Sequence, residues 1–354
     1  MSVFENPNFD GHESVSFFAE PDAGLSAIIA IHSTVLGPGA GGVRFWGYAS
    51  SSEALTDVLR LSRGMSFKNA MADLPLGGGK AVVMKPAGAF DRPKLFEAYG
   101  RCVEVLGGRY ITAEDVGVGV PDMAAVRRAT RFVGGLSEGR AASGDPSPVT
   151  ARGVYLGIRS VARRALGRDD LKGVTVAVQG VGHVGGGVCR LLKAAGAEVI
   201  VTDVDQAAVG AIVKELGARA VAPEAIYDVD AEIFSPCALG AIVNPSTIDR
   251  LKFKAIAGGA NNQLATPDMG DRLMAKGILY APDYVINSGG IINIAAEVAG
   301  QISGTYDPAW VEAKVQASNK TLDAVLDRAA AERRPTHAVA DEMAKERIAK
   351  GRKG

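Results

Sequence analysis

The chain has 354 residues, which is enough for two domains of ordinary size, each with its own core. Its 39 basic and 39 acidic side chains cancel and 47% of its residues are hydrophobic, so the composition is that of a globular protein and offers no basic field for nucleic acid. The first residues lack the charged start and apolar core of a signal peptide, and no apolar run reaches the ~18 residues of a membrane span, so we expect a cytoplasmic protein with neither a nucleic-acid nor a membrane partner.

The first part of the chain alternates patterns typical of strands and helices. Residues 15–18 and 25–32 are rich in β-branched or aromatic side chains and predict strands. Ser52 is the expected N-cap of a helix over 53–71, which carries Lys68 near its end. The remaining elements expected here are a strand at 80–85, a helix at 95–106 and a strand at 109–115, which places Lys80 and Asp115 at strand ends.

Three glycines, Gly77 to Gly79, stand directly before Lys80. They remove every side chain from the approach to the lysine and predict a turn that is free to adopt positive φ. Burial and nearby positive charge lower the pKa of a lysine towards neutrality, where its amine can serve as a base. The alternative is a glycine turn into an edge strand with a solvated lysine.

The second part of the chain begins after a stretch rich in glycine, proline and serine at 143–150, which predicts a hinge. A helix at 153–166, a β-turn-helix-β unit at 171–205 and short strands at 230–238 and 253–262 follow. This α/β alternation builds a parallel sheet covered by helices. We predict domains over 1–145 and 146–325, with a helical segment at 326–354 that packs back on the first domain.

Gly180, Gly182 and Gly185 form a G-x-G-x-x-G motif between a strand and a helix. In this context the motif predicts a Rossmann dinucleotide-binding domain, because the glycines bring a helix N-terminus against a pyrophosphate. Asp203, at the end of the next strand, would accept hydrogen bonds from the adenosine ribose hydroxyls. Together with Asp205 it would repel a 2′-phosphate, which favours NAD over NADP. The alternative is an ordinary tight turn without a ligand.

Three cysteines and four histidines are scattered along the chain. The cysteines are odd in number and form no CxxC motif, which predicts reduced packing residues. The histidines lack metal-ligand spacing, so we expect no metal site. The cysteines are Cys102, Cys189 and Cys237.

A lysine-bearing glycine segment followed by a dinucleotide motif resembles the glutamate, leucine, phenylalanine and valine dehydrogenase family, in its leucine/phenylalanine/valine branch. The resemblance implies an N-terminal α/β substrate and oligomerisation domain, a Rossmann domain, an active site in the cleft between them, and a homo-oligomer. It also implies oxidative deamination of an L-amino acid to a 2-oxo acid and ammonium, with hydride transfer to a nicotinamide. Its segments are LGPGAGGVRFW, GMSFKNAMADLPLGGGKAVV, RYITAEDVG, GDPSPVTARGVY, QGVGHVGG, FSPCALGAI, AGGANNQL and APDYVINSGGIINI.

The resemblance also implies residue roles. Lys68 becomes the cation that pairs with the substrate carboxylate, and Lys80 the base that activates the hydrolytic water. Asp115 becomes the proton acceptor for the amino group, and Asn262 an amide contact to the cofactor ribose or the substrate carboxylate. Gly41 and Gly42 would allow close backbone approach to the substrate. The predicted cofactor-binding residues are Gly180, Gly182, His183, Val184, Gly185, Asp203, Cys237, Ala238 and Asn262, where His183 stands at a variable position of the motif.

Ala40 bears on the choice of amino acid, because glutamate-specific relatives carry a lysine there that holds the side-chain carboxylate. Without that lysine a buried carboxylate would be unpaired, so the substrate side chain should be apolar. Branched-chain relatives tend to have leucine at this position. Ala113, Ile291 and Ile294 complete the predicted pocket, and we expect leucine, valine or isoleucine first and phenylalanine second.

Two rival functions stay open. An amine dehydrogenase would have lost its carboxylate anchors, yet Lys68 and Asn262 are present. A catalytically silent, NAD-binding regulatory protein would be expected to have lost Lys80 or Asp115, and the chain has both.

Overall fold

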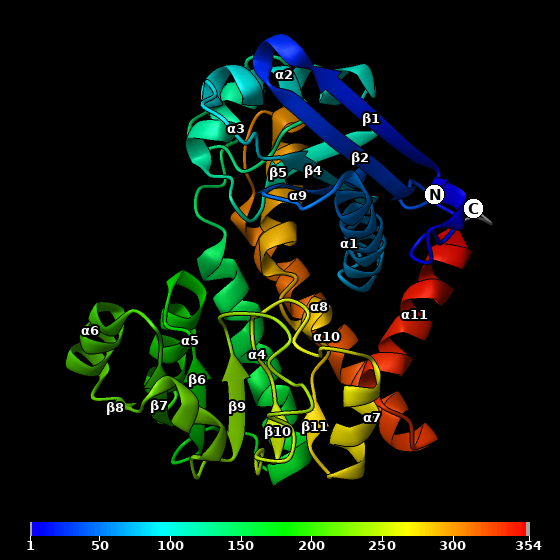
Figure 1. Ribbon diagram of the computed structural model, residues 1–354. Coiled ribbons are helices and arrows are strands. Elements are labelled where there is room, and N and C mark those ends of the chain that lie inside the picture. Colours follow the sequence, from blue (N-terminus) through cyan, green and yellow to red (C-terminus); the bar gives the residue numbers. More distant parts are fainter. Residues whose placement is uncertain (1, 140, 352–354) are drawn as a thin grey trace. The chain divides into compact units, whose positions relative to one another are not determined.

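The computed structural model describes residues 2–139 and 141–351, which divide into two compact α/β units (Figure 1). The first unit comprises Met1–Pro146, Ile291–Val311 and Ala344–Gly354. The second comprises Ser147–Gly290 and Glu312–Met343. Each unit has its own sheet and its own helices.

The first unit is built on a five-stranded mixed sheet in the order β1-β2-β4-β3-β5. β2 is antiparallel to both of its neighbours, whereas β3 runs parallel to β4 and β5. The strands predicted near the N-terminus and around Lys80 and Asp115 are confirmed, but β3 was not predicted. The strands are β1 (Ser14–Glu20), β2 (Leu25–Ser33), β3 (Gly39–Trp46), β4 (Gly77–Met84) and β5 (Tyr110–Glu114).

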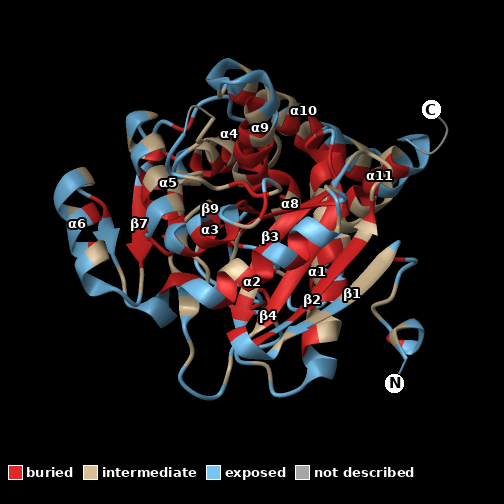
Figure 2. Ribbon diagram, turned by 90° about the horizontal axis from the view of Figure 1, so that it is seen from above, coloured by how far each residue is buried: buried red, intermediate tan, exposed pale blue. Residues whose placement is uncertain are grey.

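Helices pack on both faces of this sheet, which leaves its central strands buried (Figure 2). On one face Val58 and Leu59 of α1 pack against Ile28 and Val82. The opposite face is covered by apolar side chains of α2 and α3. The helices of this unit are α1 (Ser51–Met71), α2 (Arg92–Val105) and α3 (Val120–Arg127), with short 3₁₀ turns at Val3–Glu5 and Pro21–Ala23. From Ile291 on, α9 (Gly289–Ser303) belongs to the same unit.

The start of α1 differs from the prediction. Ser50, not Ser52, is the N-cap: its backbone is extended and its hydroxyl accepts a hydrogen bond from the Glu53 amide at 3.2 Å. Ser52 already lies inside the helix. It cannot be the cap, because only an oxygen placed before the first turn reaches the unpaired amides.

The second unit has a six-stranded sheet in the order β11-β10-β9-β6-β7-β8, with every pair parallel. Successive strands run outward from β6 in one direction and from β9 in the other, which is the Rossmann order and confirms the predicted fold class. The strands are β6 (Thr175–Gln179), β7 (Glu198–Thr202), β8 (Arg219–Ala220), β9 (Ile233–Pro236), β10 (Ala255–Ile256) and β11 (Leu279–Tyr280).

Helices accompany these strands throughout the second unit. The predicted helix at 153–166 begins earlier, so Ser147–Thr150 of the expected hinge form its first turn. The helices are α4 (Ser147–Leu166), α5 (His183–Ala194), α6 (Gln206–Leu216), a 3₁₀ segment (Pro223–Asp228), α7 (Asp268–Ala275), α8 (Asp283–Ile286), α10 (Pro308–Glu332) and α11 (Thr336–Gly351). The start of α10, up to Val311, and the part of α11 from Ala344 on cluster with the first unit.

All three cysteines are free thiols, as predicted, and Cys102 and Cys189 are buried. Among the described helices, none combines the length and apolarity that crossing a membrane requires. The described residues also contain no group of three or more histidine, cysteine, aspartate or glutamate side chains that could hold a metal ion.

A pair of histidines joins β2 to α1 in the first unit. The rings of His12 and His32 meet edge to face, with centroids 4.9 Å apart. His12 Nε2 lies 3.0 Å from the Leu59 carbonyl oxygen, and His32 Nδ1 lies 2.7 Å from the Ser66 hydroxyl. Burial, and secondly the neighbouring His12, lowers the pKa of His32 to about 4.

This histidine makes the first unit sensitive to acid. In the unfolded chain the His32 imidazole binds its proton near pH 6.5, but in the folded protein only near pH 4. The free energy of unfolding therefore falls as the pH drops from 6.5 towards 4, by roughly 3 kcal/mol at most. We predict that His32→Asn lowers the melting temperature at pH 7.5 but reduces its further fall at pH 5. The control His183→Asn removes an exposed histidine and should leave the fall unchanged. An equal fall in both variants would contradict the assignment to His32.

Candidate active site

The glycines before Lys80 do not form the predicted turn. Gly77–Gly79 lie inside β4, and none has a positive φ. They are needed for close packing: a Cβ on Gly78 would lie 2.1 Å from the Ser66 hydroxyl of α1, and one on Gly79 would lie 2.6 Å from the Tyr110 ring. The glycines therefore let α1 and Tyr110 lie directly against the strand that carries Lys80.

Lys80 and Asp115 form a direct ion pair in the first unit. Lys80 lies within β4, not at its end as predicted, and is 7% exposed. Asp115 follows β5 directly. Gly42 of β3 makes this placement possible, because a Cβ there would lie 2.8 Å from the Asp115 Cβ. The structure thus brings together two of the predicted catalytic side chains.

The Asp115 carboxylate is held in its charged form. Burial alone would raise its pKa, but the Lys80 ammonium, then Arg44 and the Val116 amide, together hold the pKa of Asp115 below its usual value. The Val116 amide donates to Asp115 Oδ1 at 2.7 Å, and Arg44 Nε lies 3.9 Å from Oδ2. Arg44 lies within one of the segments singled out in the sequence but was given no role there.

Lys68 lies in the last turn of α1 and is half-buried. The neighbouring Asn69 donates to the Gly77 carbonyl at 2.5 Å and to the Ala40 carbonyl at 3.4 Å, which ties this turn to β3 and β4. Arg347 of α11 donates to the carbonyls at the helix end, those of Ala70 and Met71, at 3.0 and 3.1 Å. The end of the helix that carries Lys68 is therefore fixed by the buried Asn69 and the half-buried Arg347.

The predicted side-chain pocket residues are buried in the first unit. Ala40 on β3 and Ala113 on β5 are 1% and 6% exposed, and Ile291 and Ile294 on α9 are 9% and 8% exposed. A Cβ on Gly134 would lie 2.8 Å from Ile294 Cγ2, so α9 passes close to the segment after α3.

Two glutamates near these residues, Glu297 and Glu114, were not predicted as site residues. Glu297, fully buried on α9, accepts hydrogen bonds from the amides of Gly135 and Leu136 at 3.1 and 3.0 Å. Burial, and then nearby carboxylates including Glu297, raises the pKa of Glu114, the neighbour of Asp115. No local pattern identifies Glu297, since its partners lie far away in the sequence.

The second unit builds the glycine motif around α5. Gly180 has φ +91° and follows β6, and a Cβ on Gly185 would lie 1.9 Å from the Gly180 carbonyl oxygen. Gly182 is the N-cap of α5, and apart from its chain neighbours and its own helix no described residue comes within 4 Å of where its Cβ would be. The open space in front of a helix N-terminus suits the pyrophosphate of a dinucleotide. His183, the first residue of α5, is exposed, and Val184 is half-buried.

The other predicted cofactor residues gather at the same edge of the parallel sheet. Cys237 and Ala238 follow β9, and a Cβ on Gly180 would lie 2.7 Å from that of Ala238. The Asn262 carbonyl accepts a hydrogen bond from Ala241 at 2.6 Å, and its side chain is exposed. β6 and β9 flank the point where the strand order reverses, which is where ligands bind in such sheets.

Asp203 fixes the glycine loop. Its Oδ2 accepts a hydrogen bond from the Val181 amide at 2.7 Å, and its Oδ1 accepts one from the Asp205 amide at 3.0 Å. Since an ionised carboxylate has about four acceptor sites, these bonds leave capacity for a ribose hydroxyl.

Comparison with known proteins gives the family. Residues 12–132 match the family model described as "Glu/Leu/Phe/Val dehydrogenase, dimerisation domain", and residues 201–353 match that described as "Glutamate/Leucine/Phenylalanine/Valine dehydrogenase". The leucine dehydrogenase of Thermoactinomyces intermedius is 47% identical over 353 residues, which cover 100% of this chain and 95% of that one. The chain belongs to the glutamate/leucine/phenylalanine/valine dehydrogenase family.

Within this family the protein is an amino acid dehydrogenase of the leucine, valine and phenylalanine branch. The phenylalanine dehydrogenase of Bacillus thermotolerans is 46% identical over 294 residues, which cover 82% of this chain and 77% of that one. Among solved structures, L-tryptophan dehydrogenase from Nostoc punctiforme matches with a TM-score of 0.84 and 39% identity over 97% of this chain and 98% of that one. The resemblance inferred from the sequence motifs is thereby confirmed.

Arg347 gives a test of how this dehydrogenase holds the end of α1. We predict that Arg347→Ala speeds amide hydrogen exchange over residues 66–71 and lowers the melting temperature by a few degrees, because unsatisfied buried carbonyls cost roughly 1–3 kcal/mol. Arg334→Ala, which removes a half-buried arginine paired with Glu332 and Glu342, is the matched control. Unchanged exchange at the end of α1 in the Arg347 variant would show that the cap does not fix the helix.

Proposed function

We propose that the protein catalyses the NAD-dependent, reversible oxidative deamination of an apolar L-amino acid to the 2-oxo acid and ammonium, with leucine, valine or isoleucine preferred. The observation that carries the proposal is the buried ion pair of Lys80 and Asp115. It lies in a chain that aligns over its full length with a leucine dehydrogenase. A silent regulatory protein would have no need for such a pair, since burying two charges is costly.

Residues of the first unit would bind the substrate and carry out the proton transfers. Lys68 pairs with the substrate carboxylate, and Asp115 accepts a proton from the substrate ammonium group. Loss of hydride from the α-carbon then leaves an iminium, which water attacks as Lys80 takes its proton. As that adduct breaks down, its hydroxyl proton and the proton held by Asp115 go to the leaving nitrogen, and Lys80 gives its proton to water. One amino acid, one NAD⁺ and one water thus yield the 2-oxo acid, ammonium, NADH and one proton.

The glycine loop of the second unit would hold the dinucleotide, with its pyrophosphate in front of α5. When bound, NAD supplies the hydride acceptor. Asp203 would accept hydrogen bonds from the adenosine ribose, and its charge together with that of the exposed Asp205 disfavours the 2′-phosphate of NADP. Asn262 stays a proposed amide contact to the ribose or the substrate carboxylate.

The substrate side chain would lie against Ala40, Ala113, Ile291 and Ile294, which are apolar and buried. These residues leave no cation for a distal carboxylate, which argues against glutamate. Phenylalanine is the second candidate because a phenylalanine dehydrogenase is nearly as similar to the chain as the leucine enzymes are. Gly41 and Gly42 stay proposed backbone contacts. The match to a dimerisation domain supports a homo-oligomer.

The direct test is NADH absorbance with NAD or NADP and a panel of L-amino acids. We expect turnover with NAD, highest for leucine, valine or isoleucine, and much weaker turnover with NADP. Lys80→Ala should lose about 10²–10⁴-fold in rate while binding NADH normally. Lys85→Ala, which removes an exposed lysine just beyond the same strand, should keep its activity. Absence of turnover with every amino acid would overturn the proposal.

Ala40 gives a second test, of the side-chain pocket. We predict that Ala40→Leu lowers kcat/KM for phenylalanine more than for leucine or valine, because the added carbons narrow the pocket and each methylene is worth roughly 1–3 kcal/mol of discrimination. The ratio of kcat/KM values in the variant and the wild type is the readout, and melting temperature controls for misfolding. If all substrates are slowed by one common factor, Ala40 does not line the pocket.

A further inference from the structure

A third charged side chain, Arg44, lies beside the pair of Lys80 and Asp115. Arg44 is on β3 in register with Val82 of β4, so it shares a face of the sheet with Lys80, two residues earlier on β4. Its Nε lies 3.9 Å from Asp115 Oδ2, the same oxygen that pairs with Lys80. The side chains of Arg44 and Asp115 are only 21% and 17% exposed, so water screens this interaction weakly.

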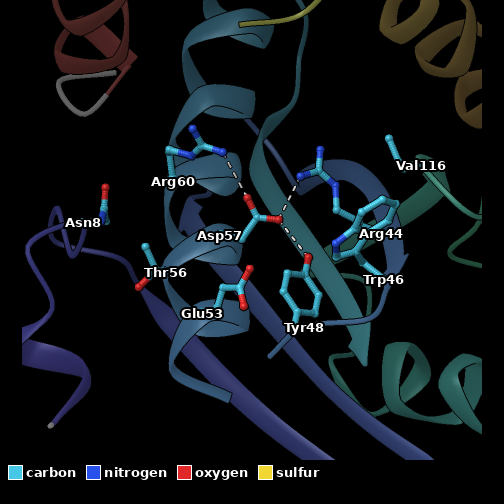
Figure 3. A pocket seen from close by; sticks show the side chains of 9 residues that line it. All are labelled: Asn8, Arg44, Trp46, Tyr48, Glu53, Thr56, Asp57, Arg60 and Val116. Carbon is cyan, nitrogen blue, oxygen red and sulfur yellow. Dashed lines mark hydrogen bonds and ion pairs between the residues drawn. The ribbon is translucent and has the colours of Figure 1, made fainter. Parts of the chain in front are cut away.

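Asp57 of α1 holds the Arg44 guanidinium in this place (Figure 3). Its Oδ2 accepts hydrogen bonds from Arg44 Nη1 and from the Tyr48 hydroxyl, each at 2.8 Å. Its Oδ1 accepts one from Arg60 at 3.2 Å. Because both of its oxygens accept hydrogen bonds, the Asp57 carboxylate is held in place and in turn fixes one edge of the Arg44 guanidinium. These side chains line a pocket of about 530 Å³, together with Asn8, Trp46, Glu53, Thr56 and Val116.

The hydrogen bond to Asp57 leaves the Nε atom of Arg44 on the side of Asp115. Its Nε is buried and forms no hydrogen bond to any described residue. At 3.9 Å from the Asp115 oxygen it acts as a charge and not as a hydrogen-bond donor. Arg44 thus places a positive charge beside Asp115, while its hydrogen bond is made to Asp57.

This charge has a use in the proposed reaction, on which the inference rests. Lys80 must be neutral before it can take a proton from water, and Asp115 must be ionised before it can accept the first proton, so in the state that binds substrate Asp115 lacks its nearest counterion. A buried carboxylate without a counterion tends to take up a proton. Arginine does not lose its proton in proteins, so it is the side chain that supplies constant charge. We propose that Arg44 is a positioning residue that keeps Asp115 ionised and in place while the Lys80 amine is neutral.

Other charged groups around Arg44 belong to the same environment. Lys80 faces it from β4, and Asp57, Glu53 and Arg60 face it from α1. Arg60 shares Asp57 with Arg44, but its side chain is 58% exposed and no contact joins it to Asp115 in the described structure. Arg60 is therefore a matched control for loss of an arginine from this cluster.

The first test is the pH profile of kcat/KM for the amino acid that the wild type turns over best. In Arg44→Gln we expect the acid-side limb to move up by about 1–3 pH units, since an opposite charge at this distance shifts a carboxyl by that amount. In Arg60→Gln the limb should stay in place. Arg44→Lys keeps the charge and should keep the limb near its native position, with a lower kcat. A uniform loss of rate without a shift in Arg44→Gln, or equal shifts in both glutamine variants, would overturn the proposal.

A second measurement does not depend on turnover. Carbon-13 NMR of aspartate carboxyls, with Asp115 assigned by Asp115→Asn, follows its ionisation in Lys80→Ala and in Lys80→Ala/Arg44→Gln. We expect Asp115 to titrate at a pH higher by about one unit or more in the double variant. Identical titration in the two proteins would refute the role of Arg44 even if the enzyme deaminates amino acids. Conversely, a wild type without turnover would refute the proposed function and leave this measurement to decide on Arg44.

Discussion

Burying Lys80 and Asp115 against each other constrains the whole first unit. Removing two charges from water is costly, and the cost is offset only where the groups meet closely and have further polar partners. Glycines provide that approach: Gly42 of β3 leaves room for Asp115, and Gly79 of β4 leaves room for the Tyr110 ring. Close packing of β3, β4 and β5 thus accompanies the buried ion pair, on which the proposed proton transfers depend.

The second unit was predictable from the sequence because each of its signals is local. The strand β6, the glycines at 180, 182 and 185, and the helix α5 follow one another directly. Asp203 was expected to face a ribose. The structure adds that Asp203 also accepts a hydrogen bond from the Val181 amide. The motif does not reveal this bond, because its two residues follow different strands.

The first unit was predictable only in outline. Gly77–Gly79 predicted a turn, and glycine-rich β3 was not predicted as a strand at all, because glycine is usually a sign of turns. These glycines are held extended by pairing with β2 and β3, and the close approach of Ser66 and Tyr110 leaves no room for a Cβ at Gly78 and Gly79. No local pattern shows either contact. Arg44 and Asp57 are likewise 13 positions apart and meet only through the packing of α1 on the sheet. Lys80 was singled out by the three glycines before it, whereas its role and that of Asp115 came from the family resemblance.

The central claim is that Lys80 and Asp115 act as one unit, and a double-mutant cycle tests it most directly. Values of kcat/KM for the preferred amino acid are measured in the wild type, Lys80→Ala, Asp115→Asn and the double variant. Groups that act together are strongly non-additive. The account predicts that the double variant is slower than the slower single variant by less than about tenfold. Losses that multiply across the two positions would show that the residues act independently and would contradict it.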